Sequence, residues 1–263
     1  MPSGFEHYRQ DGKLLASTLF VTAFCRRSGT GTTATSVLGN TVPSQISLDV
    51  SGFTSPRVVV RMPGYSVAFA SRQGNTIYMV TNAPVGSSFT YYLFDRSSTL
   101  PGRASGVGVE SYNEAGQKTF DSAYWPLKML ARLAPPATEF SLTGESYTRT
   151  GSQTLAGLAT TFSGRSKPRD GSFLCYTGGA SQWDGGACSD LRYSQYGKLF
   201  GAQVSSDGTK VTSVPVSWDD VQVRTSSNSS GTPGGISNGL TWESPYAVFA
   251  VDVTNIPVNN TFF

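Results

Sequence analysis

The chain is poor in charge and in the residues that most catalytic and metal sites require. Asp, Glu, Lys and Arg make up 14% of its 263 residues, against about 25% in an average soluble protein. It has one histidine, so a Ser-His-Asp triad is available only if His7 is its base, and we expect His7 to be structural. Its three cysteines, at positions 25, 175 and 188, are an odd number and form no disulfide framework. Cys175 and Cys188 could meet across a hairpin, but we expect two free, mostly buried thiols.

Long apolar runs and blocks of one charge are also missing. No run of about 18 apolar residues occurs, and the N-terminal segment lacks the apolar region of a signal peptide. The formal net charge is +3, and the longest basic block is the pair Arg26-Arg27. We therefore expect synthesis in the cytoplasm, no membrane insertion and no nucleic-acid partner.

Two motifs that could bind a cofactor or a metal lack features that such sites need. The segment GTGTTA at 29–34 matches a dinucleotide-binding pattern, but that pattern needs a helix directly after it, and TSVLGNTVP cannot supply a long one. We expect a loop there. Cys175 and Cys188 have no close histidine or C-x-x-C neighbour. We therefore expect no cofactor and no metal.

The residues that are abundant are typical of a β protein. The chain has 29 glycines and 12% aromatic residues, and short β-branched or aromatic runs such as PRVVVRM (56–62) and NTIYMVTN (75–82) alternate with Gly, Pro and Asn. PGY at 63–65 and QGN at 73–75 predict tight turns of an antiparallel meander, and SSDGTK predicts a two-residue turn at Asp207-Gly208. For YWPLKMLARL (124–133) a helical turn and a strand are about equally favoured.

One nine-residue pattern occurs twice. GFEHYRQDG (4–12) and GVESYNEAG (108–116) share Gly, Glu, Tyr and Gly at the same places, 104 positions apart. Each reads as a strand followed by a hairpin turn, although chance could produce four identities in nine. LPGRASG (100–106) lies just before the second copy and is typical of a connection. We therefore predict two tandem, antiparallel β-sandwich-like modules, residues 1–103 and a larger, long-looped module at 104–263.

The segment 175–200 has the composition of a recognition loop, in which aromatic residues lie among Gly, Ser and Asp. Its candidate recognition or interface residues are Tyr176, Trp183, Asp184, Tyr193 and Tyr196. The alternative is that these aromatic residues are ordinary core or subunit-interface residues. Carboxylates near aromatic residues could also cleave a polysaccharide. However, Asp184 lies in a turn-like WDGG, and the adjacent Asp219 and Asp220 should face opposite sides of a strand, so we predict no catalytic residue.

The segment GVESYNEAGQKTFDSAYWPLKML (108–130) resembles the small β-rich proteins of the tail tip, baseplate or tail fibre of tailed bacteriophages. The resemblance lies in its progression Gly-x-x-x-Tyr-Asn-x-x-Gly-x-x-x-Phe-Asp-Ser, and residues 4–18 look like a degenerate copy. YYLFDR (91–96) is similar to what precedes the motif in that family. The resemblance covers residues 87–130, extends through the degenerate copy to 1–130, and does not reach 135–263.

The resemblance implies a non-enzymatic component of the virion tail that is rigid and β-rich. Its implied partners are other tail proteins, further copies of itself in a homotrimer or ring, and a receptor or glycan on the host surface. Two alternatives stay open. One is a freestanding glycan-binding module that uses the Trp183 region, and the other is a polysaccharide depolymerase that depends on a carboxylate such as Asp184 or Asp220.

Overall fold

The structure is a computed structural model. It describes residues 6–8, 14–17, 23–35, 44–96, 108–134, 144–159, 164–168, 174–177, 180–181, 190–225 and 248–262. Every regular element among these residues is a β-strand, and the strands pair antiparallel. The expected all-β, antiparallel fold class is therefore confirmed.

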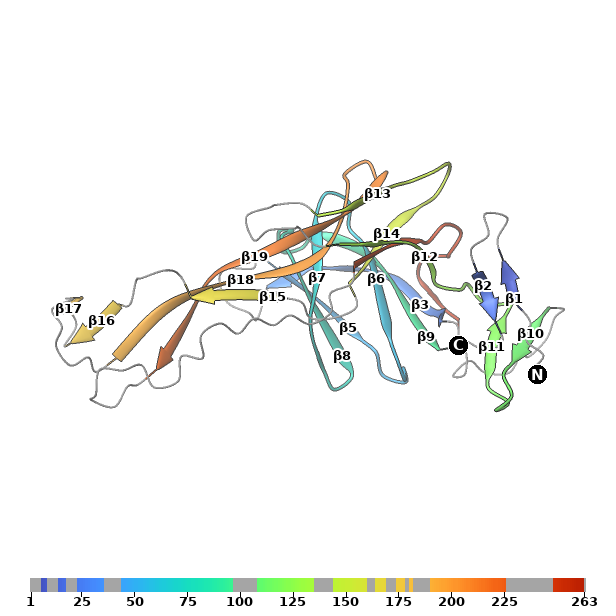
Figure 1. Cartoon of the computed structure of the whole chain (residues 1–263), viewed down its shortest axis with the longest axis horizontal. Helices are drawn as coiled ribbons and strands as arrows, with labels where there is room; N and C mark the ends of the chain where they lie inside the picture. The colour runs from blue at the N-terminus through green and yellow to red at the C-terminus, as the bar shows by residue number, and fades with distance from the viewer. Residues whose placement is uncertain are drawn as a thin grey trace.

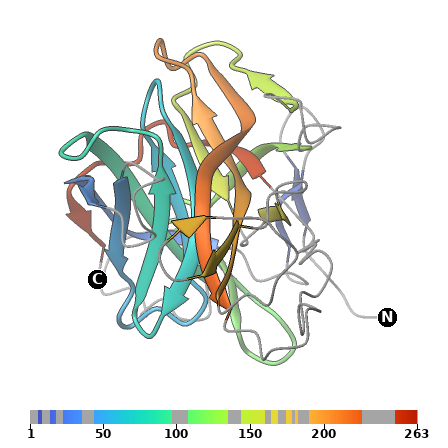
Figure 2. The ribbon, with the colours of Figure 1, turned by 90° about the vertical axis from the view of Figure 1, so that its left-hand side faces the viewer.

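Two large sheets pack face to face in a β-sandwich-like body (Figures 1 and 2). The seven-stranded sheet contains, in spatial order, β12 (Lys128–Leu133), β20 (Val248–Asp252), β14 (Leu155–Ala159), β6 (Arg57–Arg61), β9 (Ser88–Arg96), β3 (Ala23–Thr32) and β21 (Asn260–Thr261). The main path of the ten-stranded sheet contains β13 (Ser146–Thr148), β19 (Lys210–Thr225), β18 (Asp190–Val204), β7 (Ser66–Gln73), β8 (Thr76–Thr81), β5 (Ser44–Asp49) and β4 (Ala34–Thr35).

Seven further strands either join the ten-stranded sheet off its main path or form two separate hairpins. Those attached directly or indirectly to β18 are β15 (Gly164–Pro168), β16 (Leu174–Thr177) and β17 (Ala180–Ser181). One hairpin consists of β1 (Glu6–Tyr8) and β2 (Leu14–Ser17). A second hairpin, also outside the large sheets, consists of β10 (Glu110–Tyr112) and β11 (Lys118–Asp121).

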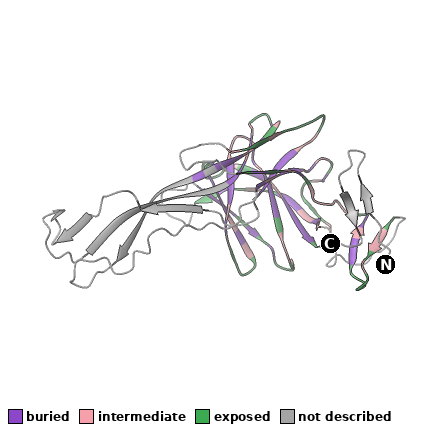
Figure 3. Cartoon of the chain, in the orientation of Figure 1, coloured by how far each residue is buried: buried purple, intermediate pink, exposed green. Residues whose placement is uncertain are grey.

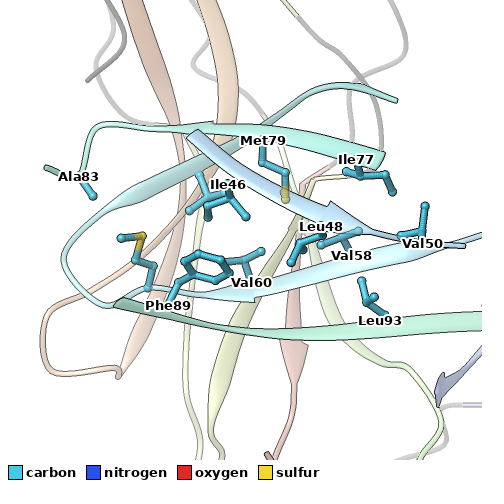
Figure 4. Close-up of a cluster of buried hydrophobic side chains, with 12 residues drawn as sticks. Ile46, Leu48, Val50, Val58, Val60, Ile77, Met79, Ala83, Phe89 and Leu93 are labelled. Carbon is cyan, nitrogen blue, oxygen red and sulfur yellow. The ribbon is translucent and has the colours of Figure 1, made fainter. Parts of the chain in front are cut away.

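The core lies between the two large sheets, where alternate residues of each strand meet. Ile46 and Met79 of the ten-stranded sheet pack against Val60, Phe89 and Leu93 of the seven-stranded sheet (Figure 4). A second cluster on the same side of the seven-stranded sheet joins β12, β14 and β20 to β18 and β19. Each of these side chains stabilises the fold by about 1.5–3 kcal/mol when fully buried, and Figure 3 shows that the buried residues concentrate in this body.

The outer face of the seven-stranded sheet is apolar and buried as well. Val59 lies there, between Val58 and Val60 of the inner face, so three consecutive valines of β6 are buried. Strands covered on both faces read as continuous apolar runs. Trp125 and Phe262 pack onto this outer cluster, and their rings contact each other with centroids 4.8 Å apart.

The segments that contain Trp125 and Phe262 also bind the edge of β3 that does not face β9. The Cys25 amide donates to the carbonyl of Trp125, the Phe262 amide donates to the carbonyl of Arg26, and the Thr30 amide donates to Oδ1 of Asn259. A free edge would offer these groups to another chain. The C-terminal strap (residues 253–262) therefore closes the sheet and covers its outer face.

The strand order bears on three of the sequence predictions. Pairing crosses the predicted boundary at 103/104 in both large sheets, since β14 pairs with β6 and β18 pairs with β7, so the two-module division is not confirmed. The turn at 63–65 exists, with Gly64 at φ 87°, but it carries the chain from one sheet to the other and makes no meander. The segment 124–133, left open between helix and strand, contains strand β12.

Candidate functional site

The predicted recognition segment falls on an arm that projects from the sandwich (Figure 1). The arm consists of β15, β16, β17, residues 190–200 of β18 and residues 215–225 of β19. At about 3.3 Å per residue, the 15 residues of β18 span about 50 Å. Only the last part of β18 pairs with the sandwich, through Ala202 and Gln203 against β7.

The structure places three of the five candidate residues on strands of this arm. Tyr176 of β16 pairs with Ser181 of β17 and with Asp190 of β18. Tyr193 pairs with Val223 of β19, and Tyr196 pairs with Lys167 of β15. Trp183 and Asp184 lie outside the described residues.

A β-bulge interrupts the arm at Tyr196. The register passes from Gln195 opposite Val221 to Gly197 opposite Trp218, so Asp219 and Asp220 both stand opposite Tyr196. A bulge breaks the strict alternation of a strand. The prediction that Asp219 and Asp220 face opposite sides relied on that alternation, and the bulge removes its basis.

A tight turn between β18 and β19 closes the ribbon at the end that belongs to the sandwich. The Ser205 amide donates to the carbonyl of Lys210, and Gly208 adopts φ 71°. Hydrogen bonds from the Ser205 hydroxyl and from the Thr209 amide and hydroxyl lower the pKa of Asp207 to about 2. The turn predicted at Asp207-Gly208 is confirmed in place, but its loop is longer than two residues, because the last strand pair is Val204 with Val211.

Gly157 and Gly201 let the sheets and strands approach closely where the arm enters the sandwich. A Cβ atom on Gly201 would lie 2.1 Å from the carbonyl oxygen of Val67 in β7. One on Gly157 of β14 would lie 2.2 Å from the Cβ of Ala202 in β18. These contacts fix the position of β18 against both neighbouring strands.

The two copies of the repeated sequence form the same hairpin at the end of the molecule opposite the arm (Figure 1). Glu6 pairs with Ser17, as Glu110 pairs with Asp121, and the register shifts at Tyr8 as it does at Tyr112. All three register pairs of the first hairpin become those of the second when 104 is added. The predicted strand is therefore confirmed in both copies and the turn in the second, whereas residues 9–13 of the first copy lie outside the described residues. Strand β2 lies against β11.

The second hairpin contains a partly buried charge network. The Lys118 ammonium donates to Glu110 at 2.7 Å and to the fully buried Asp121 at 3.0 Å. Burial lowers the pKa of Lys118, but the bonds to the two carboxylates outweigh burial and raise the pKa above its ordinary value. The Tyr112 hydroxyl donates to Glu110, and this bond raises the pKa of Tyr112. The network holds β10 on β11 and presents no reactive group.

The glycine-rich segment 29–34 lies mostly in strands, since β3 runs to Thr32 and β4 covers Ala34–Thr35. Gly29 and Gly31 lie in β3 opposite Tyr91 and Phe89. The tyrosine and phenylalanine side chains cover the glycines, with the Tyr91 hydroxyl oxygen 2.6 Å and the Phe89 Cζ 2.7 Å from where a Cβ would stand. The expectation of a loop was wrong for residues 29–32, since aromatic cross-strand neighbours support strand glycines.

The basic pair Arg26-Arg27 also has a structural role. Both guanidinium groups lie over the Phe53 ring, with centroid distances of 4.9 and 5.5 Å. Arg26 donates to the buried carboxylate of Asp95, and Arg27 donates to the carbonyl of Asp49. These contacts fasten the loop between β5 and β6 to β3.

The described residues hold no other obvious chemical site. They contain no group of three His, Cys, Asp or Glu residues placed to bind a metal ion. No helix among them is long and apolar enough to cross a membrane. Burial raises the pKa of the Cys25 thiol to about 12, so this cysteine is an unreactive core residue. His7 pairs with Ala16 in the first hairpin.

Comparison with known proteins does not identify the chain: no family model, curated protein or solved structure matches it.

Proposed function

We propose that this chain is a structural component of a tailed-phage virion, at the tail tip or baseplate, and that it contributes to attachment to the host surface. It acts without catalysis and without a cofactor. Its partners are other tail proteins and further copies of itself, in a trimer or ring. The larger part of the chain, residues 104–263, carries the outward-facing contact with the host.

The observation that supports this proposal most strongly is the hairpin formed by the tail-protein motif. Residues 110–121, within the segment 108–130 that carries the resemblance, form a discrete hairpin with a bulge, and the degenerate copy has the same register and the same bulge. Two copies of the motif that form the same hairpin are a stronger indication that the copies are related than their four identical residues in nine.

The position of the two ends adds a second argument. The paired hairpins lie at one end of the molecule and the aromatic-bearing arm at the other (Figure 1). A tail component that attaches to neighbouring proteins with one end can present the other end outward. The rigid antiparallel sandwich between them holds the two ends apart.

A glycan-binding module is the second candidate function. The arm favours it, because its strands contain Tyr176, Tyr193 and Tyr196. A freestanding module of this kind would be a stable monomer. A depolymerase is the weaker alternative, and it would depend on Asp184 or on Asp220, which lies in the arm bulge.

The proposal is tested by the oligomeric state of the purified chain and by the proteins that copurify with it. We expect analytical ultracentrifugation of the purified protein to give a defined oligomer, or affinity purification from infected cells to recover other tail proteins. We also expect no release of reducing ends from host polysaccharide. A monomer that copurifies with nothing and releases reducing ends, with loss of the activity in Asp220→Asn, would replace the proposal by the depolymerase.

A further inference from the structure

The two hairpins meet in a way that approximates twofold symmetry. They contact each other through β2 and β11, which are the same strand of the repeat. The segments that follow them also meet, antiparallel, and the Leu127 amide donates to the carbonyl of Ala23. Leu127 lies 104 positions after Ala23 and is its counterpart. Antiparallel contact between a position and its own counterpart is typical of a twofold axis, so the hairpins resemble the two halves of a homodimer.

The contact between β2 and β11 leaves β1 and β10 as the outer strands. β10 pairs with β11, and no other described segment of the chain pairs with its second edge, here called the outer edge. The Val109 carbonyl and the Asn113 amide both form hydrogen bonds with the opposite segment of the hairpin. Because these bonds alternate along an antiparallel pair, Glu110 and Tyr112 direct their amides and carbonyls toward the outer edge.

The outer edge of β1 has the same backbone geometry. Its register and its bulge are those of β10, and Glu6 and Tyr8 are the counterparts of Glu110 and Tyr112. The extra residue of each bulge lies in the inner strand, β2 or β11, so β1 and β10 themselves keep a regular spacing. Each copy of the chain therefore carries two equivalent outer edges.

The outer edge of β10 is flanked by exposed apolar side chains and lacks two common forms of protection. Val109 is 59% exposed and Tyr112 is 48% exposed. β10 contains neither lysine nor proline, which proteins often place on a free strand edge. The edge of β3, in contrast, is covered by the C-terminal strap. An uncovered strand with apolar neighbours suits a partner that adds a strand.

The sequences of the two outer edges are complementary in antiparallel register. Pairing of β10 with β1 of a second copy places Glu110 opposite the second copy's Tyr8, and Tyr112 opposite the second copy's Glu6. A tyrosine hydroxyl can donate to a glutamate there, as the Tyr112 hydroxyl does to Glu110 at 2.7 Å within β10. Parallel pairing would instead bring the carboxylates together, and like charges in opposite positions destabilise a sheet.

We infer that copies of the chain join through these edges, with β10 of one copy pairing antiparallel with β1 of the next. The contact is heterologous and uses both edges of every copy, so its repetition closes a ring. The place of such a ring in a virion tail rests on the proposed function. The pairing of the strands does not.

The test uses the full chain with proline at one outward position of each edge, Tyr112→Pro in β10 and Tyr8→Pro in β1. Proline removes the outward amide, and a strand tolerates it where that amide forms no bond within its own sheet. Tyr112→Phe and Tyr8→Phe are the matched controls, because they keep both the amide and the ring. Sedimentation velocity measures the mass of each protein, and thermal unfolding shows that each one is folded.

We expect the wild type and both phenylalanine controls to form the ring. Each proline variant alone should associate at least about tenfold more weakly and sediment as a monomer. An equimolar mixture of the two proline variants should form a dimer and nothing larger, because each supplies the one edge that the other lacks.

A cysteine pair keeps the test decisive if a proline variant fails to fold. In Tyr8→Cys/Glu110→Cys the two new thiols face each other between copies at the Cα separation of about 5.5 Å that a disulfide accepts. Oxidation should give covalent dimers and larger multimers that neither single cysteine variant gives.

Four results would overturn the inference. They are a monomeric wild type, a proline variant that assembles like its phenylalanine control, mixed proline variants that stay monomeric, and a cysteine pair that gives no more multimers than the single variants. A dimer of Tyr8→Pro alone would show that β10 pairs with β10, and would overturn it as well.

The outcome is separable from that of the proposed function. Edge-dependent rings of a chain that is absent from virions would support the strand pairing and refute the tail role. A chain found in virions whose proline variants assemble like the wild type would retain the tail role and lose the proposed contact.

Discussion

Gly29 and Gly201 are both strand glycines, but what an added methyl group would meet differs. At Gly29 it would meet the far end of the Tyr91 side chain, which can swing away. At Gly201 it would meet the backbone carbonyl of Val67 and the Cα of Ala68, which cannot move without disturbing β7. The space available at a residue is therefore decided by whether its neighbour is a side chain or backbone.

This difference predicts that replacing glycine by alanine lowers the free energy of unfolding by different amounts at the two positions. We expect Gly201→Ala to lower the free energy of unfolding by about 2–3 kcal/mol through overpacking. Gly29→Ala should cost less than about 1 kcal/mol, because alanine loses less chain entropy than glycine in a strand. Urea denaturation of both variants measures the difference, and equal costs would mean that β18 does not approach β7 this closely.

The second prediction for a single residue concerns Lys118. Replacing Lys118 by Met removes the ammonium group that donates to the fully buried Asp121. We expect a loss of about 2–4 kcal/mol in the free energy of unfolding. The exposed Lys210→Met is the control, with little expected change.

The pH dependence of this loss follows from the raised pKa of Lys118. A group whose folded-state pKa is raised contributes its stability below the unfolded value and loses it as pH rises through the folded value. The difference between wild type and Lys118→Met should therefore stay constant near neutral pH and shrink above the ordinary pKa of 10.5. A difference that instead shrinks toward acid, before the carboxylates titrate, would contradict the assignment.

Among the elements, the hairpins could be predicted from sequence and the sheets could not. A hairpin depends on neighbouring residues, so GVESYNEAG and its copy carry enough information to specify a strand and a turn. Sheet order depends on partners far apart in the chain, such as β14 with β6 and β18 with β7. No local pattern encodes those partners, and a strand-to-strand turn such as 63–65 looks the same whether it stays in one sheet or crosses to the other.

The C-terminal strap is an element whose removal has a defined consequence. Deleting residues 257–263 frees the Thr30 amide and the Arg26 carbonyl on the β3 edge and removes Phe262 from Trp125. We expect the truncated chain to associate with increasing concentration, since a free strand edge recruits other chains. Light scattering across a concentration series measures this, with the exposed Thr261→Ala as the control. An unchanged mass at every concentration would show that β3 needs no cover.

The candidate site illustrates the same limit of sequence reasoning. Tyr176, Tyr193 and Tyr196 were singled out by composition, which does not show that they belong to two paired strands, β16 and β18. Only strand pairing places these tyrosines on one arm.

In the whole molecule, the repeated motif and the predicted recognition segment lie at opposite ends of the structure. The repeated hairpins occupy one end, the arm projects from the other, and the sandwich separates them (Figure 1). This arrangement suits a protein that joins an assembly at one end and contacts a surface at the other.

The most direct measurement is immunogold electron microscopy of particles from the source culture, with antibody raised against the purified chain. Our account predicts gold clustered at one end of a phage tail. Particles left unlabelled, in a culture where the same antibody detects the chain as a soluble monomer, would contradict it and favour a freestanding glycan-binding protein.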